Sequence, residues 1–244
     1  MSIKAVIFDV DDTLFDYRYC CRKGLTAVQN KFKCFQKLSL HEFEKEQRKL
    51  SDEIHASQML AGNISLERER IERFKISFSK AGEAADESTA KEAVNIYREN
   101  YEASFRAVTG AYELLDALKS RVKIAVLSNS YYDLLMSKLV HCSLDKFVDV
   151  VVVSEQAGVT KPDTKIFIET LKKLDCKPDK AVMIGDSWEV DILGAHKAGI
   201  RSVWYNQYNQ SIPDPSIAPV INSYFPVQKV LNIIFNESEG RVEN

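Results

Sequence analysis

A cluster of acidic residues follows the first apolar run of the chain. Residues 3–8 (IKAVIF) form this run, and Asp9, Asp11, Asp12 and Asp16 come after it. Like charges repel one another, and a carboxylate is costly to move out of water unless a positive charge compensates it. Carboxylate oxygens are also the ligands that Mg²⁺ prefers in proteins. The cluster therefore indicates a site for a divalent cation, with Mg²⁺ as the expected ion.

The spacing of Asp9 and Asp11 suggests a second use for this site. In an extended segment, side chains two residues apart project to the same side, so these two carboxylates should face the same space. Such a pair can divide the work of nucleophile and general acid or base. Asp12 and Asp16 are instead expected to cap local structure or to face solvent.

Polar side chains also follow three later apolar runs. They are Ser128-Asn129, Lys161, and Asp186 with Asp191 one helical turn further on. Ligands of open α/β sheets bind beyond the carboxyl ends of the strands, so these residues should meet the acidic cluster at one edge. Ser128, the adjacent backbone N–H groups and Lys161 would supply hydrogen-bond donors and positive charge for a phosphoryl group. Asp186 would add a further oxygen ligand for the cation.

The chemistry that fits this set of groups is the hydrolysis of a phosphate monoester. Enzymes lower the barrier of that reaction by roughly 20 kcal/mol or more. General acid–base catalysis contributes only about 10²–10⁴-fold, so it cannot be the whole mechanism. Neutralisation of charge by a metal ion and a lysine, together with a covalent step, is what the reaction requires.

The elements that must position these groups alternate along the chain. The short apolar runs are rich in β-branched residues, which is typical of strands buried on both faces of a parallel sheet. Segments with apolar residues three or four apart lie between the later runs and predict helices. The alternation predicts an α/β fold with a doubly wound, Rossmann-like parallel sheet. The expected strands are residues 3–8, 122–127, 148–153, 180–184, 201–204 and, less regularly, 220–221; the expected helices between or after them are 112–119, 132–140, 164–174, 189–199 and 227–235.

A helical block separates the first strand from the rest of the sheet. Residues 43–60, 65–81 and 86–105 have the pattern of amphipathic helices, and Ser65 and Asp86 are expected to start the last two. The sequence thus predicts an α/β core domain of residues 1–16 and 107–244, with a helical domain of residues 17–106 inserted into it.

Composition narrows the class of protein. The 244 residues are 45% hydrophobic and 28% charged, with a formal net charge of -2, so there is no basic footprint for nucleic acid or for an anionic membrane. The purely apolar stretches reach only about six residues, far short of the roughly 20 that span a bilayer. These features favour a cytoplasmic protein, and the five cysteines, without a CxxC pair, are expected to be reduced thiols.

Four segments give the chain a resemblance to a known family. IFDVDDTLFD, LSNS, GVTKPDTKIF and MIGDSWEVDILGAHKAG occur in the order, and at the strand ends, of the four motifs of haloacid dehalogenase-like (HAD) hydrolases. The chain resembles the phosphatases of this family that carry a helical cap after the first strand. DDTLFD and SVWYN are most similar to segments of 5′-nucleotidases and N-acylneuraminate-9-phosphatases. The resemblance covers essentially the whole predicted core.

The resemblance also implies roles for individual residues. Asp9 matches the nucleophile that becomes an aspartyl-phosphate, and Asp11 matches the general acid and base. Asp186 matches a Mg²⁺ ligand, alongside Asp9 and the main-chain carbonyl at the position of Asp11. The remaining matches are Ser128 and Asn129 for phosphate binding, Lys161 for holding nucleophile and phosphate together, Asp191 for orienting the lysine or the waters of the metal, and Thr13 for supporting the first loop.

The residues and the resemblance leave several functions open. The first is a phosphatase for a small soluble phosphomonoester, such as a nucleoside 5′-monophosphate or a sugar phosphate. The alternatives on the same fold are a phosphomutase, a haloacid dehalogenase, which would need neither Asp11 nor Asp186, and a non-catalytic regulatory or binding protein. A helical cap should exclude macromolecular substrates. The sequence does not indicate an oligomeric state.

Overall fold

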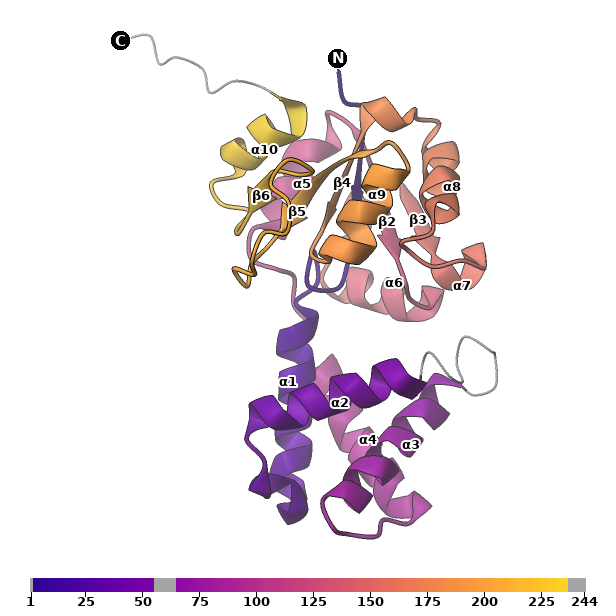
Figure 1. Ribbon diagram of the computed structural model, residues 1–244, viewed down its shortest axis with the longest axis vertical. Coiled ribbons are helices and arrows are strands. Elements are labelled where there is room, and N and C mark those ends of the chain that lie inside the picture. Colours follow the sequence, from indigo (N-terminus) through magenta and orange to yellow (C-terminus); the bar gives the residue numbers. More distant parts are fainter. Residues whose placement is uncertain (1, 55–64, 237–244) are drawn as a thin grey trace. The chain divides into compact units, whose positions relative to one another are not determined.

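The computed structural model describes residues 2–54 and 65–236, and the chain divides into two compact units. The first unit comprises residues 1–16 and 106–244, and the second comprises residues 17–105. The first is an α/β unit and the second is helical (Figure 1). Whether the helical unit acts as a cap over the active site stays a prediction.

The α/β unit is built on a six-stranded sheet in which all neighbouring strands are parallel. The strand order is β3-β2-β1-β4-β5-β6, so β1 lies at the centre between β2 and β4. The predicted α/β class with a doubly wound parallel sheet is confirmed. The strands are β1 (Ala5–Phe8), β2 (Lys123–Ser128), β3 (Val150–Val153), β4 (Ala181–Gly185), β5 (Arg201–Tyr205) and β6 (Val220–Ile221).

Helices cover both faces of this sheet. Every residue of β1 is buried, because successive side chains of a strand point to opposite faces and both faces are packed. Ala5 and Ile7 belong to a cluster with Ile166 and Phe167 of α8, which lies with α9 on one side of the sheet, whereas α5 packs against α10 (Figure 1). The helices are α5 (Ala111–Lys119), α6 (Tyr132–His141), α7 (Ser154–Ala157), α8 (Thr164–Leu174), α9 (Leu193–Lys197) and α10 (Val227–Phe235), with short turns η3 (Asp145–Phe147), η4 (Pro178–Lys180) and η5 (Trp188–Ile192).

The helical unit contains four longer helices among its described residues. They are α1 (Tyr17–Lys31), α2 (Leu40–Ile54), α3 (Leu66–Lys80) and α4 (Glu87–Glu102), with the short turn η1 (Lys33–Lys37) after α1. Ser65 and Asp86 start α3 and α4 as predicted, because their side chains accept hydrogen bonds from the backbone N–H groups of Arg68 and Thr89. The end of the predicted helix 43–60 lies outside the described residues.

Helix α1 was not anticipated from its sequence pattern. Its apolar positions are irregular, and Gly24 lies in its middle. The structure explains the glycine, since an added Cβ atom would lie 2.7 to 2.9 Å from the ring and carbonyl of Tyr97 on α4. A close approach of two helices, which the sequence of one helix cannot reveal, therefore decides this position. None of the helices among the described residues is both long and apolar enough to cross a membrane.

Candidate active site

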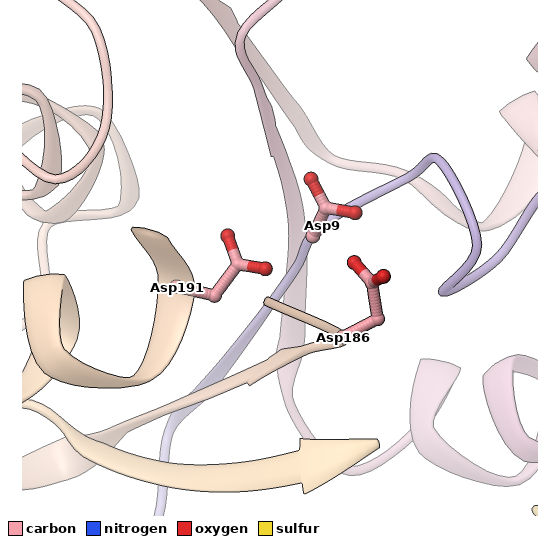
Figure 2. A group of neighbouring side chains, drawn as sticks. All are labelled: Asp9, Asp186 and Asp191. Atoms are coloured by element: carbon pink, nitrogen blue, oxygen red, sulfur yellow. The ribbon is translucent and has the colours of Figure 1, made fainter. Parts of the chain in front are cut away.

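The two central strands bring distant acidic residues to one edge of the sheet. Phe8 of β1 pairs with Ile184 of β4, and the backbone N–H of Asp9 donates to the Ile184 carbonyl at 2.9 Å. Asp9 therefore lies just past the end of β1, and Asp186 lies just past the end of β4. Figure 2 shows the carboxyl groups of Asp9, Asp186 and Asp191 turned toward a shared space.

Lys161 is the cation at the centre of this edge. Its Nζ atom donates to Oδ1 of Asp9 and to Oδ1 of Asp191, both at 2.6 Å, and its side chain is 2% exposed. Burial alone would lower the pKa of Lys161, but the charges of Asp191 and Asp9 outweigh it and raise that pKa. The ammonium group is thus held in its charged form between two carboxylates.

Asp191 is positioned by an unusual turn. It lies in η5, a π-helical turn in which the Ile192 N–H donates to the Ser187 carbonyl at 3.2 Å. Its Oδ2 atom accepts from the Ser187 N–H at 3.1 Å, and Oδ1 accepts from Lys161. Both of its oxygens are therefore occupied by protein donors. Turns of this kind recur at functional sites.

Gly185 makes room for the Asp191 side chain. A Cβ atom added to Gly185 would lie 2.4 to 2.5 Å from the Asp191 carboxyl group and Cβ atom. Position 185 therefore requires glycine because of the close approach of a side chain and not because of turn geometry, since its backbone is not left-handed. Gly158 does serve turn geometry, with a φ of +68° at the end of α7.

Asp9, Asp186 and Asp191 form a candidate metal site. One oxygen from each lies within 4.8 Å of the others. Burial, followed by the charges of Asp9 and Asp191, raises the pKa of Asp186 to about 9. Within the described part of the chain, no donor contacts the Asp186 carboxylate or Oδ2 of Asp9. Unpaired, clustered carboxylate oxygens fit a divalent cation, which would supply the missing positive charge.

Ser128 and Asn129 lie on the other side of β1, at the end of β2. The Asn129 side chain is engaged in a reciprocal pair, since its Nδ2 donates to the Lys161 carbonyl at 2.9 Å and its Oδ1 accepts from the Lys161 N–H at 2.8 Å. This amide fixes the lysine loop next to β2. Ser128 is buried at the strand end, and its proposed contact with phosphate stays a prediction.

Asp11 has a different partner from Asp9. Its two carboxylate oxygens accept from Nζ of Lys138 on α6 at 2.6 and 2.8 Å. Asp11 is not a member of the three-carboxylate cluster. Nothing in the sequence pointed to Lys138, because the two residues are 127 positions apart and α6 has an ordinary amphipathic pattern.

The remaining acids of the first loop have structural contacts. Asp12 was expected to cap local structure or to face solvent, and the second alternative is wrong, because Asp12 is buried. Its φ is +59°, and its carbonyl accepts from Nε2 of Gln207 at 2.9 Å. Asp16 pairs with Arg106, whose Nε donates to it at 2.8 Å. Thr13 is fully buried and its carbonyl accepts from the Tyr224 hydroxyl at 3.1 Å, which is compatible with its predicted supporting place.

Side chains of the segment after β4 also fix the site through hydrogen bonds, and the sequence alone did not predict them. The indole N–H of Trp204 in β5 donates to the Asp186 carbonyl at 2.8 Å, and the ring of Trp188 packs edge-on against it. With the Gln207 and Tyr224 bonds described above, this segment holds three carbonyls of the loops that follow β1 and β4. Buried aromatic residues with a polar atom usually have such a partner, but the sequence does not say which.

Comparison with known proteins agrees with this geometry. The model of the haloacid dehalogenase-like hydrolase family matches residues 3–199. The ribulose-1,5-bisphosphate 5-phosphatase of Halopiger xanaduensis is 29% identical over 212 residues, 85% of this chain and 86% of that protein. The human N-acylneuraminate-9-phosphatase is 28% identical over 239 residues, 95% of this chain and 92% of that protein. The resemblance drawn from the four motifs is confirmed.

A solved structure shows the same fold. The magnesium-bound HAD hydrolase YfnB of Bacillus subtilis superposes with a TM-score of 0.73 at 22% identity. The match covers 96% of this chain and all of that one.

Proposed function

The chain belongs to the haloacid dehalogenase-like hydrolases and hydrolyses phosphoric monoesters, and we propose that it does so as a Mg²⁺-dependent phosphatase for a small phosphomonoester. The observation that carries the proposal is the buried contact of Lys161 with both Asp9 and Asp191, beside the unpaired carboxylate of Asp186.

In the proposed first step, a carboxylate oxygen of Asp9 attacks phosphorus, and the bond from phosphorus to the leaving oxygen breaks. The product is an aspartyl-phosphate on Asp9. The Lys161 ammonium, 2.6 Å from Oδ1 of Asp9, stays beside the attacking group and offers positive charge to the phosphoryl oxygens. Asp191 keeps this ammonium in place through its second contact at 2.6 Å.

Asp11 is proposed to handle the protons of both half-reactions. As a carboxylic acid, it donates its proton to the leaving oxygen, which departs as an alcohol. The resulting carboxylate then takes a proton from the water that attacks the phosphorus of the aspartyl-phosphate. This second step releases phosphate, restores the Asp9 carboxylate and returns Asp11 to its acid form.

The candidate metal site fits Mg²⁺ through Asp9 and Asp186. The family resemblance adds the main-chain carbonyl at the position of Asp11. When bound, the ion would supply Lewis-acid stabilisation of negative charge on the phosphoryl oxygens. Because both oxygens of Asp191 already accept hydrogen bonds, we assign Asp191 to the lysine and not to the ion.

The alternatives on this fold are less well supported. A haloacid dehalogenase would use a nucleophile such as Asp9, but it has no need of Asp11 as an acid or of a metal ligand at Asp186. A phosphomutase would use the same groups, and retention of the phosphoryl group from a bisphosphate would reveal it. A non-catalytic protein would need neither the cation of Lys161 nor the carboxylates of Asp9 and Asp186 to meet at one edge of the sheet.

For the substrate we propose a nucleoside 5′-monophosphate or a sugar phosphate. The support is the similarity of DDTLFD and SVWYN to 5′-nucleotidases and N-acylneuraminate-9-phosphatases, and the names of the relatives, which are phosphatases of phosphorylated sugars. In this proposal, the helical unit is a cap that selects the leaving group and excludes macromolecules.

The test of this proposal is hydrolysis of p-nitrophenyl phosphate by the purified protein with Mg²⁺ and after removal of the metal by a chelator. We expect activity that requires the metal and that the Asp9→Asn variant has lost. The matched control is Asp16→Asn, which removes a carboxylate from the same loop and should keep activity within about two-fold, because Asp16 pairs with Arg106 and is not in the three-carboxylate cluster.

Two results would overturn the proposal: an inactive wild type with Mg²⁺ present, or full activity in Asp9→Asn. A panel of nucleoside monophosphates and sugar phosphates, compared by kcat/KM, would then identify the substrate class. A phosphoprotein as the best substrate would contradict the role given to the helical unit.

A further inference from the structure

Lys138 is a buried cation of the α/β unit that no step above uses. It lies in the last turn of α6, and its side chain is only 9% exposed. Its ammonium group contacts both oxygens of Asp11, at 2.6 and 2.8 Å, and lies 5.1 Å from the centre of the Phe15 ring. A lysine in this position is costly to bury unless it has a defined partner.

The two ends of this ion pair differ in their freedom. The Asp11 side chain is 34% exposed and lies outside the cluster held by Lys161, so neither burial nor that cluster fixes its carboxylate. Lys138 is fixed by burial, by the helix that carries it and by the Phe15 ring. The contact to both carboxylate oxygens therefore transfers the rigidity of α6 to Asp11.

Position matters more for Asp11 than for an ordinary surface acid. A general acid must lie within hydrogen-bonding reach of the oxygen that it protonates, and small displacements are expensive in rate. The opposite charge of Lys138 also faces the carboxylate that Asp11 becomes once it has given up its proton.

The geometry points to Lys138 as the positioning residue that holds Asp11 in place for proton transfer to and from the leaving oxygen. This inference rests on the proposed function, because it takes Asp11 as the general acid and base. Lys138 acts through Asp11: the proton passes between Asp11 and the leaving oxygen or water, and Lys138 gives up no proton.

The test compares two aryl phosphates of similar size. p-Nitrophenolate leaves readily without a proton, whereas phenolate is more basic and depends more on a general acid. Replacing Lys138 by Met should lower kcat for phenyl phosphate by about 10-fold or more, and kcat for p-nitrophenyl phosphate much less. Asp11→Asn should show the same selectivity for the leaving group, with a larger loss.

Three further variants separate positioning from folding. Lys138→Arg keeps a cation and should recover most of the phenyl phosphate activity. Asp11→Asn/Lys138→Met should be no slower than Asp11→Asn, because residues that act as one unit have non-additive effects. Lys172→Met, which removes an exposed lysine from α8, is the control for loss of charge and should leave both activities unchanged.

Equal losses on both esters, or a Lys138→Met effect that multiplies with Asp11→Asn, would overturn the inference and indicate a structural role. The comparison of the two esters is a ratio within each variant, so a lower yield of folded protein does not affect it. If Lys138→Met does not fold, Lys138→Gln is subjected to the same comparison. A wild type that hydrolyses neither ester would instead overturn the proposed function, and this inference with it.

Discussion

Two regions of the molecule bury charged side chains, and they do so in different ways. At the edge of the sheet, Lys161 contacts Asp9 and Asp191 at 2.6 Å each. Inside the helical unit, Arg73 and Glu69 of α3 are 9% and 2% exposed, yet their closest contact is 3.7 Å. In the described part of the chain, Nε of Arg73 and Oε1 of Glu69 have no hydrogen-bond partner.

The difference shows that burial of charge does not by itself mark a functional site. The Arg73 guanidinium lies 6.0 and 5.9 Å from the rings of Phe74 and Tyr97, which is the loose contact of a cation packed on aromatic rings. Such a pair contributes little to stability, because desolvation offsets its attraction. At the sheet edge, by contrast, residues from three separate segments converge with short contacts, and this convergence is what chemistry requires.

The largest effect on activity is expected from removing the central cation of the sheet edge. Lys161→Met should lower kcat for p-nitrophenyl phosphate by about 10³-fold, because the charge that stabilises the transferring phosphoryl group is lost. Steady-state kinetics with saturating Mg²⁺ measures this. Lys172→Met is again the control, and more than a tenth of wild-type activity in Lys161→Met would contradict the role given to Lys161.

Removal of the Asp186 carboxylate should stabilise the protein without metal and should make it less stable than the wild type when Mg²⁺ is present. Without metal, Asp186→Asn should be at least as stable as the wild type, because repulsion from Asp9 and Asp191 is relieved. With Mg²⁺ at 100 times its dissociation constant, the wild type should gain about 2.7 kcal/mol and the variant almost nothing. Thermal unfolding with and without Mg²⁺ measures both. An equal gain in the variant would place the metal elsewhere.

Much of this site could be predicted from the sequence, because its main residues follow apolar runs directly. Asp9, Ser128 and Asp186 come at or just after the ends of β1, β2 and β4, and parallel strands bring their carboxyl ends together. The local sequence pattern and the strand order of the sheet therefore place these residues at the same edge. The boundaries of the strands were correspondingly within two residues of the observed ones.

The rest depends on contacts between residues that are distant in the chain. Lys138 lies on a helix whose pattern reports only which face is buried, so its pairing with Asp11 has no local signal. Asn129 resembles a phosphate ligand in sequence, whereas its side chain bonds to the backbone of Lys161. Gly185 has no left-handed backbone to explain it, and only the position of Asp191 does.

Adding a single methyl group at Gly185 should change the sheet edge less than removing a charged side chain does. Gly185→Ala should displace Asp191 and, through it, Lys161. We expect a loss of about 1–3 kcal/mol in the free energy of unfolding and a roughly 10-fold lower kcat. Gly82→Ala is the matched control, because its φ is +84° but no atom lies within 4 Å of the added Cβ. The control should lose stability through backbone strain alone. Unchanged kcat in Gly185→Ala would show that the close approach is not needed for catalysis.

The smallest effect on activity is expected from the charges of the helical unit. Arg73→Met alone should cost about 3 kcal/mol in the free energy of unfolding, because Glu69 is left buried without a counter-charge. The double variant Arg73→Met/Glu69→Leu should recover that stability and hydrolyse p-nitrophenyl phosphate within about two-fold of the wild type. Urea unfolding and steady-state kinetics measure the two effects.

The equivalent double change at the sheet edge should differ from the change in α3 in its effect on activity. Lys161→Met/Asp191→Leu also removes a buried ion pair, so it can regain stability, but it should regain no activity, because the lost ammonium has a task in the reaction. A ten-fold loss of activity in Arg73→Met/Glu69→Leu would contradict this distinction. It would mean that the pair in α3 also serves catalysis, and that a contact of 3.7 Å with unpaired atoms is no sign of a merely structural charge.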